Sequence, residues 1–441
     1  MDPGVVRPAV GAGPGGGPAG AGWWRRIGAG RGPVSRGVRP PGHRTEESVM
    51  TAFRRSSRSA RVLVPAAVAV ALLAGCAQGA GGAASAADPM PRSSVSPGAS
   101  APGPSVTVTP APAGTGAAAP GTLLVADFGS DTVTFVDPAR GATGSVKVGT
   151  APYGLVVGKD GRAWVATAEG VAVVDTATRR RLALVPYLTD TGPVTTGEYR
   201  GGGMGIALSP DGRRVYVGVN VPGGNGALEV VDTTALRVTE AVEVGRRPFD
   251  VDVSRDGTEV YATNHDSFDV TVVAADTLRA RRVEVAPYGT EGGLGSWLKP
   301  HYTAVRPSDG KLLLPFEGER LAVVDPRTGR TTIEPMTANT HQHGVTVTAD
   351  GTLFTVGTGP IDPDEDRGPS LTVRTPAGAE RVYPLEGPHE GVAVSRDGRT
   401  AYVTGGFTRD GYWDGLTVVD LASGDTRRLA AGSRPLGVAV L

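Results

Sequence analysis

A pattern of short strands recurs along the chain from residue 121 onward, with a period of about 40–50 residues. Its fullest copy, at 247–277, reads RPFDVDVSRDGTEVYATNHDSFDVTVVAADT: a turn with proline, a strand, an Asp-Gly turn, a second strand, a loop and a third strand. Asp-Gly between two alternating apolar runs is typical of a β-hairpin. A repeat of this length made of strands predicts the blades of a β-propeller, because a single unit cannot bury its own apolar faces.

Five further copies and two incomplete ones account for the rest of 121–441. The complete copies begin with APYGLVVGKDGRAWVAT (151–167), GGMGIALSPDGRRVYVGV (202–219), KPHYTAVRPSDGKLLLP (299–315), HQHGVTVTADGTLFTVG (341–357) and PHEGVAVSRDGRTAYVTGG (388–406). Residues 121–148 carry a second and a third strand without a first one, and residues 433–441 are a lone first strand. Together the two ends complete one blade and leave no open sheet edge. We therefore expect an all-β fold, a seven-bladed β-propeller with a closing blade shared by the two ends.

These repeats resemble those of the YVTN-repeat family of seven-bladed propellers. The motif stands here as YATN at 261–264 and, less closely, as YVTG at 402–405 and YVGV at 216–219. The resemblance covers nearly all of 121–441. It implies the fold and says little about activity, because propellers host many functions.

Residues 50–75 have the features of a bacterial lipoprotein signal peptide. The basic segment MTAFRRSSRSAR (50–61) precedes an apolar run that is too short to span a bilayer. The run ends in Leu-Ala-Gly-Cys at 73–76, which resembles a lipobox and implies cleavage before Cys76 and acylation of that cysteine with diacylglycerol and palmitate. A plain signal peptide with an incidental cysteine is the alternative. We expect a protein tethered by lipid to the outer, extracytoplasmic face of the bacterial cell membrane.

The segments on either side of the signal peptide have no pattern that could build a core. Residues 1–49 are rich in Gly, Pro and Arg, and we interpret them as a misassigned start before Met50 or as a disordered extension. Residues 76–120 are rich in Ala, Gly, Pro and Ser, which predicts a tether. The folded part is therefore 121–441.

Composition excludes several kinds of partner and site. The 44 basic and 44 acidic residues balance, which gives no reason to expect nucleic acid as a partner. Cys76 is the single cysteine, so an internal disulfide is impossible and a thiolate metal site is not expected. We expect a monomer. The folded part contains no GxSxG elbow, no phosphate-binding loop and no HExxH motif.

Five of the six histidines lie in 121–441, and we expect all five at one face of the propeller. The first strand of each blade starts at that face, and the loop between the second and third strands lies there too. Aligning the repeats on their Asp-Gly turns gives one equivalent position per blade: Tyr153, Met204, Phe249, Tyr302, His343, Glu390 and Leu436. His301 and His389 come one position earlier, His341 lies in the turn before His343, and His265 lies in a second-to-third-strand loop.

Imidazoles from three successive blades, with a carboxylate beside them, suit Zn²⁺ or Cu²⁺. The predicted metal site comprises His301, His343 and His389, with His341 or Glu390 as an additional ligand and His265 more peripheral. The alternative is that each histidine caps backbone groups in its own turn. The propeller domain of nitrous-oxide reductase, which is YVTN-like, carries copper-binding histidines on this face. This chain lacks the second, cysteine-bearing copper domain of that enzyme, so redox catalysis by that route is not expected.

Four aromatic residues are candidates for contacts with a small ligand: Tyr153, Phe249, Tyr412 and Trp413. The last two lie in GGFTRDGYWDG (405–415), which also fits a packed lid. The acidic loop IDPDEDRG (361–368) resembles a cation-binding loop, but it lacks the spacing of a calcium loop, and we favour a solvated charged loop.

Two functions compete. The first is a binding or scaffold module that holds a metal, a small molecule or a protein partner at the histidine face. The second follows from the resemblance to lactonase-like and streptogramin-lyase-like propellers, in which His and Glu near a divalent cation act as general base and electrophile. His389 and Glu390, in PHEG at 388–391, are then the candidate catalytic pair. Because no nucleophile can be identified, we favour binding.

Overall fold

The computed structural model describes residue 118 and residues 120–285, 299–316, 320–337, 342–357, 368–408 and 411–441. Within these ranges the chain forms strands and turns, and none of it is a helix long and apolar enough to cross a membrane. The predictions for the signal peptide, Cys76, the tether, His341 and the acidic loop up to residue 367 lie outside the described residues.

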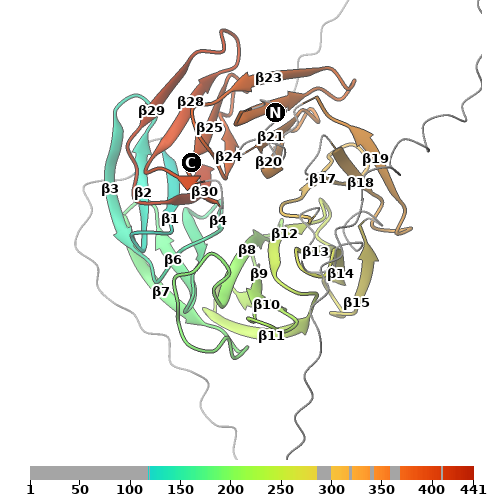
Figure 1. Ribbon diagram of the computed structural model, residues 1–441. Helices are drawn as coiled ribbons and strands as arrows, with labels where there is room; N and C mark the ends of the chain where they lie inside the picture. Colours follow the sequence, from blue (N-terminus) through green and yellow to red (C-terminus); the bar gives the residue numbers. More distant parts are fainter. Residues whose placement is uncertain are drawn as a thin grey trace, which may run out of the picture. The chain divides into compact units, whose positions relative to one another are not determined.

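Seven four-stranded antiparallel sheets succeed one another around a central axis, as predicted (Figure 1). We number the blades in chain order and give the strands of each from the axis outward. Blades 1 to 3 are β4(Leu155–Val157), β5(Arg162–Ala166), β6(Gly170–Asp175) and β7(Arg180–Pro186); β8(Gly202–Leu208), β9(Arg214–Asn220), β10(Ala227–Asp232) and β11(Arg237–Glu243); and β12(Pro248–Val253), β13(Glu259–Asn264), β14(Asp269–Ala274) and β15(Ala280–Glu284).

Blades 4 to 6 repeat the arrangement, with a short two-stranded ribbon added after β25 in blade 6. Their strands are β16(Ala304–Val305), β17(Leu312–Phe316), β18(Arg320–Val324) and β19(Thr331–Pro335); β20(Gln342–Val347), β21(Leu353–Gly357), β22(Ser370–Arg374) and β23(Glu380–Pro384); and β24(Val392–Val394), β25(Thr400–Thr404), β28(Leu416–Asp420) and β29(Thr426–Leu429). The ribbon consists of β26(Phe407–Thr408) and β27(Gly411–Tyr412).

The closing blade joins the two ends of the propeller. Its strands are β30(Pro435–Val440), β1(Leu123–Asp127), β2(Thr132–Asp137) and β3(Gly141–Lys147). β30 pairs with β1 in antiparallel register, with Leu123 opposite Val440 and Val125 opposite Val438. The shared blade predicted from the two incomplete repeats is therefore confirmed.

The hydrophobic core lies between neighbouring blades, so the middle strands are buried on both faces. This explains why β1, β5 and β17 contain continuous apolar runs where a one-sided strand would alternate. Between blades 1 and 2, for example, Trp164 and Val173 belong to one buried cluster with Val215 and Val217. The outermost strands, such as β15 and β29, are mostly exposed.

The innermost strands approach one another closely enough to form backbone hydrogen bonds between blades. Three of these bonds run from a glycine amide to a carbonyl of the adjacent blade: Gly154 to Met204 (3.1 Å), Gly344 to Glu390 (2.8 Å) and Gly437 to Tyr153 (3.1 Å). A Cβ added at Gly437 would lie 2.6 Å from the Tyr153 oxygen, which is too close for any other residue. These contacts fix the positions of the side chains next to these glycines at the start of the innermost strands.

Deleting residues 434–441 is expected to lower the free energy of unfolding by more than about 3 kcal/mol. The deletion removes the buried Leu436, a loss of about 2–5 kcal/mol by itself, together with the hydrogen bonds between β30 and β1. Denaturant unfolding measures the change. Thr426→Ala, on the exposed outer strand of blade 6, is the control and should leave the stability unchanged. A truncated protein as stable as the control would contradict closure by β30.

Candidate functional site

The seven residues aligned in the sequence form a ring around the axis, which we call the mouth ring: Tyr153, Met204, Phe249, Tyr302, His343, Glu390 and Leu436. The Phe249 ring lies edge-to-face against Tyr153 at 5.8 Å and against Tyr302 at 5.9 Å between centroids. A cavity of about 180 Å³ below them is lined by Tyr153, Met204, Phe249, Tyr302 and Leu436. The mouth ring is thus apolar on one side and carries His343 and Glu390 on the other.

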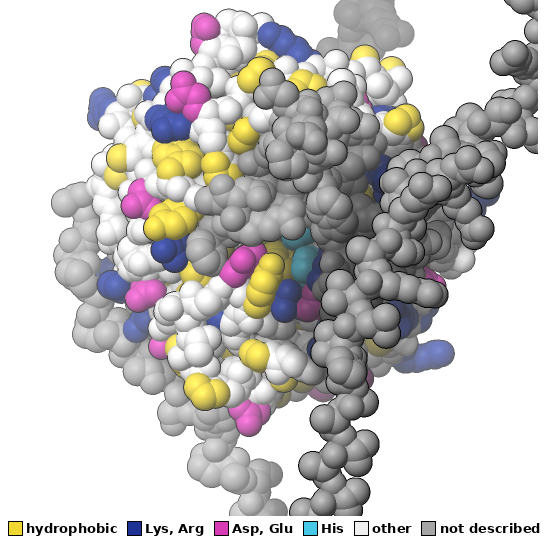
Figure 2. All heavy atoms as spheres, viewed as in Figure 1, with side chains coloured by type: hydrophobic (Ala, Val, Ile, Leu, Met, Phe, Trp, Pro, Cys, Tyr) yellow, Lys and Arg dark blue, Asp and Glu magenta, His cyan; other side chains and the backbone are white. Residues whose placement is uncertain are grey.

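Three histidine rings from successive blades lie in a row at this face, and we call them the histidine row. The centroids of His265, between β13 and β14, and His301, before β16, are 4.6 Å apart. Those of His301 and His343 are 4.5 Å apart. All three residues are between 3% and 6% exposed. Figure 2 shows histidine side chains near the middle of this face, next to basic, acidic and hydrophobic ones.

A carboxylate lies at each end of the histidine row. Asp266 Oδ1 is 2.8 Å from His265 Nδ1, and both carboxylate oxygens of Glu390 are 3.0 Å from His343 Nδ1. The Tyr302 hydroxyl also donates to Glu390, at 2.8 Å. A carboxylate partner fixes the orientation of an imidazole ring and holds a proton on the nitrogen that faces it. Each end of the row is therefore held in one orientation.

Burial keeps His265, at one end of the row, uncharged. Desolvation lowers the pKa of His265 to about 4, against the opposing effect of Asp266. Burial raises the pKa of Asp266, but its contacts with His265, Arg247 and Lys299 outweigh burial and hold the pKa well below its usual range. At neutral pH a neutral imidazole therefore faces an ionised carboxylate. The Nδ1–H group of His265 donates a hydrogen bond to Asp266.

The loop that carries His265 is held by the turn that leads into β12. The backbone of Arg247, just before Pro248, is in the left-handed region with φ 56°. Its carbonyl accepts the His265 amide at 3.0 Å, and the Arg246 carbonyl accepts the Asp266 amide at 3.1 Å. A non-glycine residue is uncommon in this conformation, above all before proline. Ala151 and Arg434 share it before the prolines of two other blades, so it belongs to the repeat.

His389 is held within blade 6 and does not join the row. Its Nδ1 lies 2.8 Å from the Gly387 carbonyl and its Nε2 lies 2.8 Å from the Thr417 hydroxyl. Burial lowers the pKa of His389 to about 4, so the neutral ring donates to Gly387 and accepts from Thr417. The structure thus groups His301 and His343 with His265 and not, as the sequence suggested, with His389. Glu390 likewise contacts His343 and Tyr302 across the blade boundary.

The described part of the chain contains no group of three or more His, Cys, Asp or Glu side chains arranged to hold a metal ion. His341 is outside that part. Zinc or copper at the channel mouth therefore stays a prediction.

A pocket of about 380 Å³ opens beside the row, and we call it the cationic pocket. Its walls include Tyr199, Arg246, Arg247, Asp266, Lys299 and the turn after β9 at 221–224. Arg247 Nη2 lies 2.9 Å and Lys299 Nζ lies 3.1 Å from the carboxylate of Asp266. Tyr199 is 44% exposed, stacks on the Arg247 guanidinium at 3.7 Å and lies 6.2 Å from the His265 ring. The pocket is thus connected to the row through Asp266 and Tyr199.

The four predicted ligand-contacting aromatic residues have different environments. Tyr153 and Phe249 are almost fully buried in the mouth ring. Trp413 packs against His389 at 5.6 Å and under the Arg428 guanidinium at 4.5 Å, as expected of a packed lid. Tyr412 is 48% exposed and stacks with Arg434 at 4.1 Å. Among the described residues, Tyr199 is an exposed aromatic residue beside the histidine row, and the sequence analysis did not select it.

Two carboxylates lie close together on β12, the innermost strand of blade 3. Asp250 and Asp252 are two residues apart on β12, so they point to the same side of the strand. Asp250 accepts hydrogen bonds from the amides of Val251 and Thr303, both at 2.9 Å. Burial raises the pKa of Asp250 to about 6, and burial together with the Asp250 charge raises the pKa of Asp252 well above its usual value. The pair therefore holds a proton at a pH where ordinary carboxylates are ionised.

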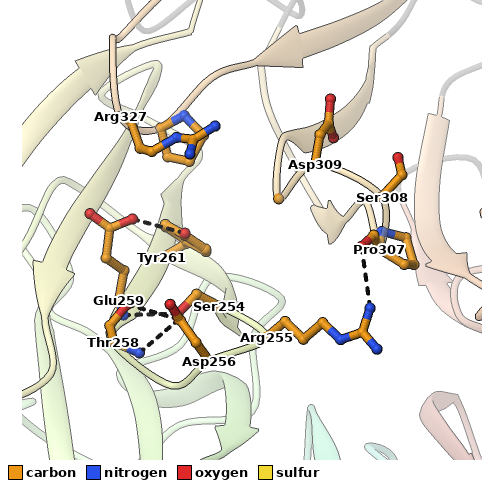
Figure 3. A pocket seen from close by; sticks show the side chains of 12 residues that line it. Ser254, Arg255, Asp256, Thr258, Glu259, Tyr261, Pro307, Ser308, Asp309 and Arg327 are labelled. Carbon is orange, nitrogen blue, oxygen red and sulfur yellow. Dashed lines mark hydrogen bonds between the residues drawn. The ribbon is translucent and has the colours of Figure 1, made fainter.

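A larger pocket, of about 690 Å³, lies at the Asp-Gly turns of blades 3 and 4, at the other ends of the strands from the mouth (Figure 3). Its carboxylates are engaged in local bonds. Asp256 accepts from Ser254 and Thr258, and Glu259 accepts from the Tyr261 hydroxyl at 3.0 Å. Since these carboxylates are already bonded within their own hairpin, we assign the candidate site to the histidine face.

Sequence reasoning missed Tyr199, Arg247, Asp266 and Lys299. Two signals were present: the arginine pair before the proline in GRRPF, and the aspartate next to His265 in NHDS. Both lie beside positions already placed at the mouth by the repeat. Lys299 is the first residue of the copy at 299–315, three positions before Tyr302, so the repeat places it at the mouth as well. Tyr199 lies outside the strand pattern, and nothing in the sequence places it there.

No protein-family model matches this chain, and no curated protein matches it. Solved structures share its fold. The periplasmic gluconolactonase PpgL of Pseudomonas aeruginosa is 18% identical over 73% of this chain and 99% of its own, with a TM-score of 0.54. A functionally unknown protein from Desulfotomaculum acetoxidans is 11% identical over 73% of this chain and 98% of its own, with a TM-score of 0.55.

Virginiamycin B lyase from Staphylococcus aureus is 14% identical over 65% of this chain and 87% of its own, with a TM-score of 0.48. The likeness to the gluconolactonase and to the Desulfotomaculum protein supports the propeller fold alone, because the identities are low. The chain is a seven-bladed β-propeller.

Asp252→Asn is expected to stabilise the protein at about pH 8 by about 1–3 kcal/mol and to have little effect below about pH 4. The folded state raises the pKa of the Asp250–Asp252 pair, so the pair's contribution to stability is fully present below the unfolded pKa. It is lost as the pH rises through the folded pKa. Asparagine carries no charge and avoids this loss. Thermal melts across this pH range measure the difference.

Asp256→Asn, in the exposed turn of the same hairpin, is the control. Hydrogen bonds from Ser254 and Thr258 lower the pKa of Asp256 to about 2, so this change should destabilise at neutral pH. A melting temperature of Asp252→Asn that follows that of the parent at every pH would contradict a proton held by the pair.

Proposed function

We propose that this protein is a lipid-anchored, extracytoplasmic binding module that receives a small polar molecule at the histidine row. The observation that carries the proposal is the row itself. His265, His301 and His343 come from three blades and are nearly fully buried, and carboxylates orient the two at the ends, His265 and His343. Titratable groups that are buried together and oriented in this way are typical of functional sites.

Two further features support a ligand of small-molecule size. The adjoining cationic pocket has a volume of about 380 Å³, within the range of about 300–1,000 Å³ typical of such sites. Tyr199 presents an exposed aromatic ring at its edge. Aromatic side chains next to a few oriented polar groups are the usual lining of ligand pockets.

The second candidate function is a lactonase- or lyase-like reaction assisted by a metal. The contact between His343 and Glu390 favours it, because an imidazole oriented by a carboxylate is the arrangement of a general base. The catalytic pair is then His343 and Glu390, with Tyr302 on the same carboxylate, since the ring nitrogens of His389 are engaged by Gly387 and Thr417. His343 could instead hold a zinc or copper ion together with His301, and in that case it would not also act as the base.

Membrane anchoring is tested at Cys76. Cys76→Ser is expected to move the protein from the membrane fraction to the soluble one, because acylation requires the thiol. Fractionation and mass spectrometry of the N-terminal peptide measure this. Ser85→Ala, in the tether, is the control and should stay in the membrane fraction. An unmodified Cys76 in membrane-bound protein would refute the anchor.

The histidine row is tested with His301→Gln and His343→Gln, against His389→Gln as the matched control. A panel of lactones, sugars and sugar acids is screened by thermal shift, with the soluble Cys76→Ser protein as the parent. We expect at least one compound to stabilise the parent and His389→Gln, and to lose about tenfold or more in affinity in both row variants. His389→Gln should itself lower stability by about 1–3 kcal/mol, since it disturbs two buried hydrogen bonds.

The same proteins separate binding from catalysis. Elemental analysis and titration with Zn²⁺ and Cu²⁺ test the metal, whose affinity should fall below about pH 6 because imidazole must be neutral to bind it. Hydrolysis of a panel lactone that stops in His343→Gln and with chelator would favour the enzyme. Binding that is unchanged in both row variants would rule out the row as the site.

A further inference from the structure

We infer that the cationic pocket binds an oxyanion, the carboxylate or phosphate group of the small molecule whose other end meets the histidine row. This inference deepens the proposed function and rests on it. It concerns Arg246, Arg247 and Lys299, none of which belongs to the row.

Charge is the first reason. Arg246, Arg247 and Lys299 line the pocket, and Asp266 is the carboxylate among its lining residues. Asp266 already forms ion pairs with Arg247 and Lys299 and accepts a hydrogen bond from the His265 ring. Glu198, which hydrogen-bonds Tyr199 and is not part of the lining, brings a second negative charge close by. Even with Glu198 counted, the positive charges outnumber the negative ones, so the pocket favours an anion.

The position of Arg246 is the second reason. Its side chain donates a hydrogen bond, at 3.3 Å, to the carbonyl of Gly223, which also lines the pocket. A guanidinium has five N–H donors in a planar fork, and one bond to a carbonyl leaves donors that can face an oxyanion. Arg247, in contrast, is fixed by Asp266 and by the Tyr199 ring. Arg246 is therefore the side chain most suited to bind the anion directly.

The exposure of Tyr199 is the third reason, and it indicates an organic anion. The ring covers Arg247 on one side and leaves 44% of the residue exposed at the pocket rim. The body of a small organic anion can pack on this exposed surface while its charged group reaches Arg246. From there the molecule extends towards His265, since the Tyr199 ring lies 6.2 Å from that imidazole.

The test uses the full chain with Cys76→Ser and two probes, inorganic phosphate and citrate, against sodium chloride at matched ionic strength. Matching the ionic strength separates binding from general screening. Both probes are expected to raise the melting temperature of the parent above the chloride control. Calorimetry should then show about tenfold or weaker binding in Arg246→Gln, because one charge-assisted contact is lost.

Arg255→Gln is the matched control. It removes a guanidinium from the pocket of Figure 3, which lies at the other ends of the strands, and should bind both probes as the parent does. Lys299→Gln is a second variant at the site, in case Arg246→Gln fails to fold, and it should also weaken binding. Equal binding in the parent and both site variants, or no binding of either probe to the parent, would overturn the inference.

Failure of the anion inference can be told apart from failure of the proposed histidine-row function. His301→Gln leaves the cationic pocket intact, so it should still bind phosphate. If phosphate binds and no panel compound depends on the row, the anion site stands and the histidine-row function fails. If panel compounds depend on the row but Arg246→Gln binds them as the parent does, the histidine row stands and the anion inference fails.

Discussion

The site at the channel mouth depends on how closely the innermost strands of successive blades approach one another. Backbone hydrogen bonds between blades, such as the one from Gly344 to Glu390, set this distance. His343 follows His301 by 42 residues in the chain and Glu390 follows His343 by 47, so only this lateral packing brings the side chains of each pair into contact. A side chain at Gly344 would push the two strands apart, and the members of the histidine row would move apart with them. Local backbone geometry and candidate chemistry are therefore linked through a few hydrogen bonds.

Much of the fold could be predicted from the sequence because each copy of the repeat carries the same turn signals at the same spacing. The Asp-Gly turns locate the hairpins, and the two incomplete copies at the ends determine how the ring closes. The fourth strand of each blade was not predicted, for a physical reason: β15 and β29 lie at the rim, and their exposed, charged residues have no apolar pattern. The ribbon of β26 and β27 likewise interrupts the repeat, and the described residues of the other blades contain no counterpart to it.

The site was predicted by position, and position does not determine the direction of a side chain. His301 and His389 are equivalent in the repeat, yet one packs between two histidine rings and the other turns into its own blade. The difference lies in the neighbours. Thr417 and the Gly387 carbonyl satisfy both nitrogens of His389, whereas Phe249 and His265 surround the ring of His301. The sequence analysis considered His265 more peripheral, but two backbone hydrogen bonds to the Arg246–Arg247 turn hold its loop beside the row.

The shared closing blade has a consequence for how the molecule reaches its native state. Leu123 and Val440 are opposite each other in one ladder although more than 300 residues separate them. β30 follows every other propeller strand in the chain, so β1 has no inner partner until all the other blades have been made. Contacts of such high sequence separation form slowly, and an unpaired inner strand can pair with another chain in the meantime. The apolar β1 is thus the segment where misassembly would begin. It stays open to pairing with another chain until β30 has paired with it.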